Sequence, residues 1–173
     1  MELVTLLDEQ GNYAGTLPKH EVHTADTPLH LAFSCYLFSD DDHLLVTRRA
    51  LTKQTWPGVW TNSFCGHPLP QEQMHEAIAR RAAQELGTQV RDIRIAIPDF
   101  RYRAVDASGV VENEICPVYT ATIDEDLAPA REEVAEWAWT TLDAAVAAVE
   151  SAPYAFSPWM REQSAQLLMV REG

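Results

Sequence analysis

Short apolar runs separated by polar turns recur along the chain and predict β-strands. The first pair, Leu3–Leu7 and Tyr13–Leu17, flanks a turn-forming segment and predicts a hairpin. Further strands are predicted at Leu29–Phe38, Leu44–Thr47, Arg91–Arg103, Val110–Ile123 and Val134–Thr140.

A helical period replaces this pattern at three places. Across Glu72–Leu86, apolar residues recur at every fourth position, and Gly87 follows where a C-terminal cap belongs. Leu142–Glu150 is rich in alanine, and Ser157 with Pro158 forms an N-cap and first turn that open a final helix. Strands and helices therefore interleave without strict alternation, which predicts the mixed α/β (α+β) class, with a mixed β-sheet between helices.

Composition is consistent with one globular domain over residues 1–173, because 46% of the residues are apolar and 23% are charged. The charge balance is 13 basic against 26 acidic side chains, a net charge of −13. Such a chain repels a phosphate backbone, so we expect no nucleic-acid partner. A small anionic substrate would need a local basic pocket or a bound cation.

The odd set of cysteines, Cys35, Cys65 and Cys116, indicates free thiols in a reducing compartment. No apolar run approaches the ~20 residues of a membrane span, and the acidic start lacks the pattern of a signal peptide. We therefore expect a cytoplasmic protein with no membrane association.

Two acidic residues in a predicted strand, Glu112 and Glu114, project to the same side with Cα atoms ~6.6 Å apart. Taken alone, this segment fits an edge strand with a solvated acidic face better than it fits a cation site. Paired carboxylates nevertheless also attract a cation. His23, His30 and His67 add imidazoles, and three His with two Glu suit Mn²⁺ or Zn²⁺. The spacing matches no compact metal motif, so scattered surface histidines are the alternative.

Cys65 lies beside Gly66 and His67, just ahead of a predicted helix whose positive end would lower the thiol pKa. A buried, unreactive thiol is the commoner alternative, and we expect it for Cys35 and Cys116, which lie in apolar strand patterns.

Only two of the 13 basic residues are lysines, Lys19 and Lys53, and two adjacent arginine pairs lie at positions 48–49 and 80–81. A phosphate pocket in so acidic a protein would use these few cations. Scattered solubilising charge is the alternative for each of them.

The segment that starts at Gly66 resembles the Nudix box, in which a glycine precedes a spaced series of acidic residues, an arginine and a second glycine. The residues that match in register are Gly66, Glu72, Arg80, Glu85 and Gly87. Arg81 and Gln84 replace two acidic residues, and Thr88 is a weak fit to the last hydrophobic position. The resemblance implies a Nudix-like fold, but loss of two metal-binding carboxylates disfavours Nudix hydrolysis.

Six further blocks, in order from near residue 19 to residue 160, resemble the type I isopentenyl diphosphate isomerases. They are His23–Ser34, Leu45–Leu51, Trp56–Pro68, Phe100–Arg103, Glu112–Glu114 and Phe156–Met160. The resemblance implies an enzyme of isoprenoid biosynthesis that interconverts isopentenyl and dimethylallyl diphosphate by protonation and deprotonation.

The resemblance also implies a role for each matching position. A Mn²⁺ or Zn²⁺ would be held by His23, His30, His67, Glu112 and Glu114. A Mg²⁺ that arrives with the diphosphate would be held by Glu85 and the Cys65 carbonyl, and the diphosphate itself by Lys19, Arg49, Lys53 and Arg81. The proton-handling groups would be Cys65, Glu114 and Tyr102, with Trp159 as an aromatic wall that faces a carbocation.

Several alternatives stay open at this point. The second candidate function is a Nudix pyrophosphohydrolase acting on a nucleoside or prenyl diphosphate, and the third is a silent diphosphate-binding module. The sequence does not distinguish which of Cys65 and Glu114 is the acid and which is the base. It also leaves both a monomer and a homodimer open. The final helix beyond Met160 is assigned only a packing role.

Overall fold

The computed structural model describes residues 2–173, in which twelve strands, four α-helices and one short 3₁₀ helix follow one another. The strands are β1 (Leu3–Leu7), β2 (Tyr13–Pro18), β3 (His30–Leu31), β4 (Phe33–Phe38), β5 (Leu44–Arg49), β6 (Trp60–Thr61), β7 (Phe64–Gly66), β8 (Val90–Ile97), β9 (Arg101–Val105), β10 (Val111–Ile115), β11 (Val118–Ile123) and β12 (Val134–Thr140). The helices are α1 (Lys19–Val22), α2 (Met74–Leu86), α3 (Leu142–Ser151), the 3₁₀ helix η1 (Pro153–Ala155) and α4 (Pro158–Glu172).

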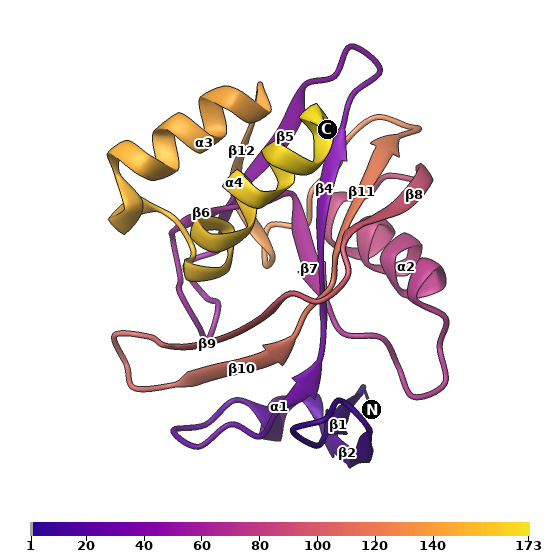
Figure 1. Cartoon of the computed structure of the whole chain (residues 1–173), viewed down its shortest axis with the longest axis vertical. Helices are drawn as coiled ribbons and strands as arrows, with labels where there is room; N and C mark the ends of the chain where they lie inside the picture. Colours follow the sequence, from indigo (N-terminus) through magenta and orange to yellow (C-terminus); the bar gives the residue numbers. More distant parts are fainter. Residues whose placement is uncertain (1) are drawn as a thin grey trace.

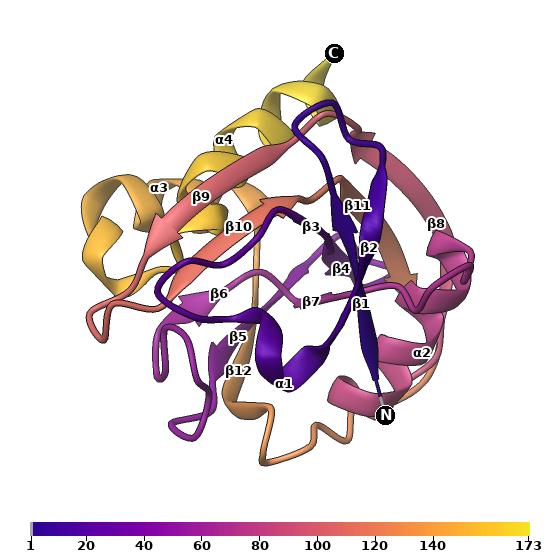
Figure 2. The same cartoon turned by 90° about the horizontal axis from the view of Figure 1, so that it is seen from below.

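The larger sheet lies between helices, with α3 and α4 on one side and α2 on the other (Figure 1). Its strand order is β12-β5-β4-β11-β8, and β6 and β7 pair with β5 and β4. A smaller sheet, β2-β1-β3-β10-β9, lies at one end of the molecule (Figure 2). Each sheet has one parallel pair, β11 with β4 and β10 with β3, among antiparallel neighbours. The predicted mixed class is confirmed.

Strand β4 is buried on both faces, which explains its unbroken run of aromatic and small residues. Phe33 and Leu37 pack in the core on the α2 side, together with Ile78. Tyr36 points to the opposite face and packs with Met160 of α4. Side chains alternate across the strand, so this one element supports both layers of helices.

Three of the predicted strands are each broken in two, and this differs from the expectation of continuous strands. The breaks fall at Ala32, between β3 and β4, and at the segments that contain Pro98 and Pro117. Proline removes a backbone donor, so it ends regular pairing. Main-chain bonds still cross the breaks, from Ala32 N to the Ile115 carbonyl (3.0 Å) for example. The two halves of each predicted strand therefore join different sheets, and the sheets meet along this line.

Helix α2 begins at Met74, two residues later than predicted, because Gln73 and Glu76 form a capping box. It ends at Gly87, whose φ of 61° is left-handed, as the sequence predicted. Ser157 accepts a bond from the Met160 amide as the predicted N-cap of α4. The short helix α1 was not predicted. No helix within residues 2–173 has the length and apolarity that crossing a bilayer requires.

Candidate active site

A cavity of about 520 Å³ opens where the two sheets meet. Twelve of the predicted site residues line it: Lys19, His23, Arg49, Lys53, Cys65, His67, Arg81, Glu85, Tyr102, Glu112, Glu114 and Trp159. His30, the remaining one, is fully buried and lies 3.3 Å from the Glu114 carboxylate. The fold therefore gathers all the predicted site residues from both sheets and from α1, α2 and α4.

Four side chains that could hold a metal ion converge beside this cavity. His23, His30, His67 and Glu114 each offer one ligand atom, and these atoms lie within 4.8 Å of one another. They come from the end of α1, from β3, from the residue after β7 and from β10. Glu112 adds a carboxylate 3.0 Å from the His23 Nε2.

Within residues 2–173, several of these buried polar atoms have no hydrogen-bond partner: Nε2 of His23, Nε2 of His30 and Oε2 of Glu112. These atoms lie close to one another, but their geometry does not allow hydrogen bonds between them. Leaving such atoms unpaired in a protein interior costs free energy. A cation bound among them removes that cost. The mixture of imidazole and carboxylate donors fits a first-row divalent ion.

Other side chains and carbonyls orient these ligands. The Nδ1 of His30 is 2.9 Å from the Pro28 carbonyl, and Thr55 donates to the Glu112 carboxylate (2.7 Å). Such outer contacts fix the direction of a metal ligand. Thr55 was not expected from the sequence, since nothing in the local pattern marks it.

The interpretation of Glu112 and Glu114 as a solvated acidic edge is wrong. Strand β10 lies between β3 and β9, so it is not an edge, and both residues are only 6% exposed. The carboxylates are buried beside imidazoles and not in solvent.

Glu114 stands at the centre of a network of proton-bearing groups. It accepts a bond from the Tyr102 hydroxyl (3.0 Å), and its other oxygen is 3.2 Å from the His67 Nε2. Burial opposes its ionisation, but the imidazoles of His30 and His67 hold the pKa of Glu114 well below its usual value. Burial, reinforced by the Glu114 charge, raises the pKa of Tyr102 well above its usual value. The structure therefore favours an ionised carboxylate beside a protonated phenol.

The Cys65 thiol lies on β7 and lines the same cavity as Glu114. Burial raises its pKa to about 12, so the expectation that a helix end lowers this pKa is wrong. The physical reason is burial, which penalises the charged thiolate and outweighs the hydrogen bonds with Ser34 and Asn62 that lower the pKa. Cys35 and Cys116 are buried and free, as predicted.

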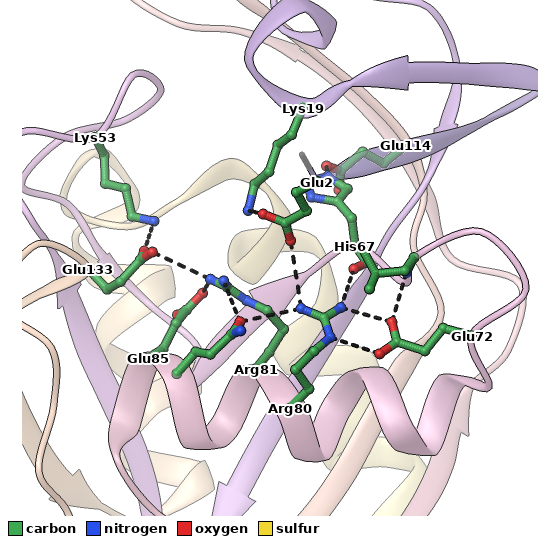
Figure 3. A network of polar contacts seen from close by, with 12 residues as sticks. Glu2, Lys19, Lys53, His67, Glu72, Arg80, Arg81, Glu85, Glu114 and Glu133 are labelled. Atoms are coloured by element: carbon green, nitrogen blue, oxygen red, sulfur yellow. Dashed lines mark hydrogen bonds and ion pairs between the residues drawn. The ribbon is translucent and has the colours of Figure 1, made fainter.

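Three of the four predicted phosphate-binding cations, Lys19, Lys53 and Arg81, are paired with acidic residues along the cavity (Figure 3). Lys53 pairs with Glu133, and Arg81 pairs with Glu85 and lies 3.6 Å from Glu133. Gly66 makes room for this arginine, since a Cβ there would lie 2.7 Å from the Arg81 Cγ. Glu133 was not predicted, because it lies far from these partners in the sequence.

Lys19 is held in the same way by Glu2, at 3.0 Å (Figure 3). Arg49 instead bonds to the Thr55 carbonyl (2.8 Å) and lies over the Trp159 ring, 5.2 Å from its centre. The Trp159 ring also contacts Tyr102, with centres 5.8 Å apart. One wall of the cavity is therefore aromatic and the adjoining side is cationic.

Glu72 and Arg80 form a two-pronged ion pair, with N–O distances of 2.7 and 2.8 Å (Figure 3). Arg80 also donates to the His67 carbonyl (3.0 Å), and Glu72 accepts from the Leu69 amide (2.7 Å). This pair therefore connects α2 to the loop that carries His67.

Comparison with known proteins places this geometry in a family. The profile of the NUDIX domain family matches residues 28–166. A protein named isopentenyl-diphosphate Delta-isomerase from Kocuria rhizophila is 62% identical over 162 residues, which is 94% of this chain and 90% of that protein. A protein of the same name from Agromyces mediolanus is 60% identical over 172 residues, which is 99% of this chain and 83% of that protein.

Solved structures with little sequence similarity share the fold. A Deinococcus radiodurans protein has a TM-score of 0.74 at 17% identity, and the match covers 96% of this chain and 99% of that one. The MutT protein from Methanosarcina mazei Go1 has a TM-score of 0.66, also at 17% identity, covering 84% of this chain and 97% of that one. The fold is thus shared by proteins of low identity, whereas the two relatives at 60–62% identity carry the same name. The chain belongs to the NUDIX domain family and, within it, to the isopentenyl-diphosphate Delta-isomerases.

Proposed function

We propose that this protein interconverts isopentenyl diphosphate and dimethylallyl diphosphate by adding one proton and removing another. One observation carries the proposal: a thiol, Cys65, and a buried carboxylate, Glu114, line the same cavity beside an aromatic wall. Such a pair can hold a proton on one group and accept a proton on the other.

The diphosphate would bind among Lys19, Arg49, Lys53 and Arg81. Three of these cations are paired with carboxylates in the free protein. A diphosphate carries more charge than one carboxylate and offers more acceptor oxygens, so it competes for these donors. The hydrocarbon part would then extend toward Trp159, along the apolar side of the cavity.

The reaction itself needs a proton donor and a proton acceptor. A proton is added to the terminal methylene carbon, which leaves a tertiary cation, and a proton is lost from the carbon next to the oxygen-bearing one. Alkenes are weak bases, so the donor must be strong in its setting and water must be excluded. Cys65 and Glu114 would share these two roles. Tyr102, whose hydroxyl donates a hydrogen bond to Glu114, would help that carboxylate to exchange a proton.

The tertiary cation would be stabilised by the face of Trp159. A cation over an aromatic ring gains about 1–2 kcal/mol when both are away from water. Trp159 is only 3% exposed, so its ring face belongs to such a dry environment.

The imidazole and carboxylate groups gathered in the site fit divalent ions. His23, His30, His67, Glu112 and Glu114 would hold Mn²⁺ or Zn²⁺, and Glu85 with the Cys65 carbonyl would hold a Mg²⁺ that enters with the diphosphate. Bound at these places, the ions would supply positive charge that acidifies neighbouring groups and neutralises the diphosphate.

The site requires Cys65 as a free thiol. Cys35, Cys65 and Cys116 are all unpaired in the structure. Free thiols persist in a reducing compartment, so we propose the cytoplasm as the location of this protein.

Hydrolysis of the diphosphate is the competing activity, because the Nudix register is present. Arg81 stands in place of an acidic residue and forms an ion pair with Glu85, which leaves fewer carboxylates for metals that activate water. An isomerase releases no phosphate, so phosphate release from isopentenyl diphosphate and nucleoside diphosphates discriminates between the two activities.

The test uses the substitutions Cys65→Ala and Glu114→Gln, assayed by NMR for the allylic product with Mg²⁺ and Mn²⁺ present. We expect each to lower kcat by about 10²–10⁴-fold, the usual contribution of a general acid or base. Glu162→Gln, at an exposed position of α4, is the matched control and should behave as wild type. Near-normal turnover in either active-site variant, with an unchanged circular dichroism spectrum, would overturn the mechanism.

A further inference from the structure

The Cys65 sulfur has two polar neighbours on the protein side of the cavity. Ser34 Oγ from β4 and Asn62 Oδ1 from the turn before β7 both lie 3.4 Å from it. Both residues are completely buried. The direction of the thiol therefore depends on how these two side chains are themselves held.

The orientation of Asn62 is fixed by its own bonds. Its amide nitrogen donates to the carbonyls of Cys35 and Phe64, both at 2.9 Å. Its oxygen therefore faces the other way, where it accepts from the Trp159 indole (2.9 Å) and the Cys65 thiol. One oxygen atom thus holds both the thiol and the aromatic wall.

The orientation of Ser34 is fixed from α4. Gln163 donates through Nε2 to the Ser34 hydroxyl oxygen (2.9 Å). The other end of the Gln163 amide accepts from the Tyr36 hydroxyl (3.2 Å), which determines which way the amide faces. The Ser34 oxygen thus accepts a hydrogen bond from Gln163. Its own single hydroxyl hydrogen therefore points away from Gln163 and is free to be donated to a sulfur.

Two sulfurs compete for that hydrogen, because Cys116 Sγ also lies 3.4 Å from the Ser34 oxygen. Only Cys65 lines the cavity, so only a bond to Cys65 affects chemistry there. The chain of contacts runs from Tyr36 through Gln163 and Ser34 to Cys65, entirely within the protein interior.

We propose that Gln163, acting through the Ser34 hydroxyl, is a positioning residue that fixes the direction of the Cys65 thiol for proton transfer. The inference rests on the proposed isomerisation and extends it to the C-terminal helix. The expectation that α4 beyond Met160 only packs is therefore replaced by a second role for this helix. Small errors in the placement of a reacting group lower rates steeply, so a contact of this kind affects kcat more than KM.

The first experiment compares Gln163→Met with Gln166→Met. The two glutamines lie on the same helix, but Gln163 is fully buried and Gln166 is exposed. We expect Gln163→Met to lower kcat by about 10-fold, with KM for isopentenyl diphosphate within a factor of two. Gln166→Met should leave both constants unchanged.

Loss of stability needs separate treatment, because Gln163→Met leaves the buried Tyr36 hydroxyl without its acceptor. The double variant Tyr36→Phe/Gln163→Met removes both partners of that bond, which is less destabilising than removing one. We expect its unfolding midpoint to return toward that of wild type while kcat stays low. Recovery of kcat together with stability would show a purely structural role and overturn the proposal.

A double-mutant cycle tests whether Gln163 acts through Ser34. If it does, Ser34→Ala and Gln163→Met lower kcat by similar factors, and their combination lowers it no further. Multiplicative losses would mean independent effects and would overturn the proposed route.

Crystal structures of wild type and of Tyr36→Phe/Gln163→Met give a readout that does not depend on activity. We expect the Cys65 sulfur to occupy a second rotamer in the variant. An unchanged rotamer overturns this inference and leaves the proposed function standing. If wild type forms no allylic product, the proposed function is wrong, and the rotamer alone then decides whether Gln163 positions the thiol.

Discussion

At the scale of single residues, the site depends on charges that are buried with their partners. Glu114 is kept ionised by two imidazoles and at the same time accepts a hydrogen bond from the Tyr102 hydroxyl. Cys65, across the same cavity, keeps its proton because burial raises its pKa to about 12. In the free protein the two groups therefore differ in proton content.

The contact between Tyr102 and Glu114 leads to the first prediction. Tyr102→Phe removes one hydrogen bond to a carboxylate, so we expect kcat to fall by about 10- to 100-fold with little change in KM. Tyr154→Phe is the control, since that side chain is 85% exposed. A Tyr102→Phe enzyme with wild-type kcat would remove the phenol from the mechanism.

The roles proposed for single residues depend on the resemblance to a known family. The local sequence around these residues alone favoured ordinary surface or buried positions. The sequence around Glu112 and Glu114 predicts a solvated edge strand, whereas in the structure their strand β10 lies between β3 and β9. Glu133 and Gln163 could not be found at all, because their partners lie far away in the sequence. Such contacts depend on tertiary structure, and hydrophobic periodicity carries no information about them.

At the scale of elements, the apolar pattern predicted most strands and helices but not where strands change sheets. Pro98 and Pro117 lie in two of the breaks, and Ala32 lies in the third, where no residue type signals an interruption. These breaks place β3 and β10 in the smaller sheet, and the ligand residues His30 and Glu114 on these strands lie close to His67, which follows β7. The caps at Gly87 and Ser157 were predictable because they depend on local backbone geometry alone.

The ion pair between Glu72 and Arg80 gives a prediction for α2. We expect Glu72→Gln to lower the free energy of unfolding at pH 7 by about 1–3 kcal/mol, as for a hydrogen bond to a charged group. Urea unfolding provides the measurement, and Glu162→Gln, at an exposed position, is the control.

The same pair predicts the pH dependence. The Arg80 guanidinium holds the pKa of Glu72 below its usual value in the folded protein. As pH falls below about 4.3, Glu72 is therefore protonated first in the unfolded chain. The stabilisation is then lost progressively until the pH passes the lower pKa of Glu72 in the folded protein. The difference between wild type and Glu72→Gln should thus shrink at low pH, and a constant difference from pH 7 to pH 3 would contradict this account.

At the scale of the whole molecule, the proposed metal site joins segments that are far apart in the sequence. His30 and Glu114 lie on β3 and β10 of the smaller sheet, whereas His23 follows α1 and His67 follows β7. A cation held there would stabilise the folded state over the unfolded chain, in which these ligands are dispersed.

Metal removal and return test this. Protein treated with a chelator and then given Mn²⁺ or Zn²⁺ at about 100 times Kd should gain about 2.7 kcal/mol, and Tm should rise by several degrees. His23→Ala should weaken the response, whereas His20→Ala should not, because the His20 side chain is 70% exposed. Equal responses in the two variants would place the metal elsewhere.

The most direct test of the central claim follows isopentenyl diphosphate by NMR in D₂O with the wild-type enzyme. Two separate groups that exchange protons with solvent should yield dimethylallyl diphosphate with deuterium in the new methyl group and no released phosphate. A product without deuterium would mean that one hydrogen moves directly within the substrate, and inorganic phosphate without an allylic product would mean hydrolysis; either result would contradict proton transfer between Cys65, Glu114 and the substrate.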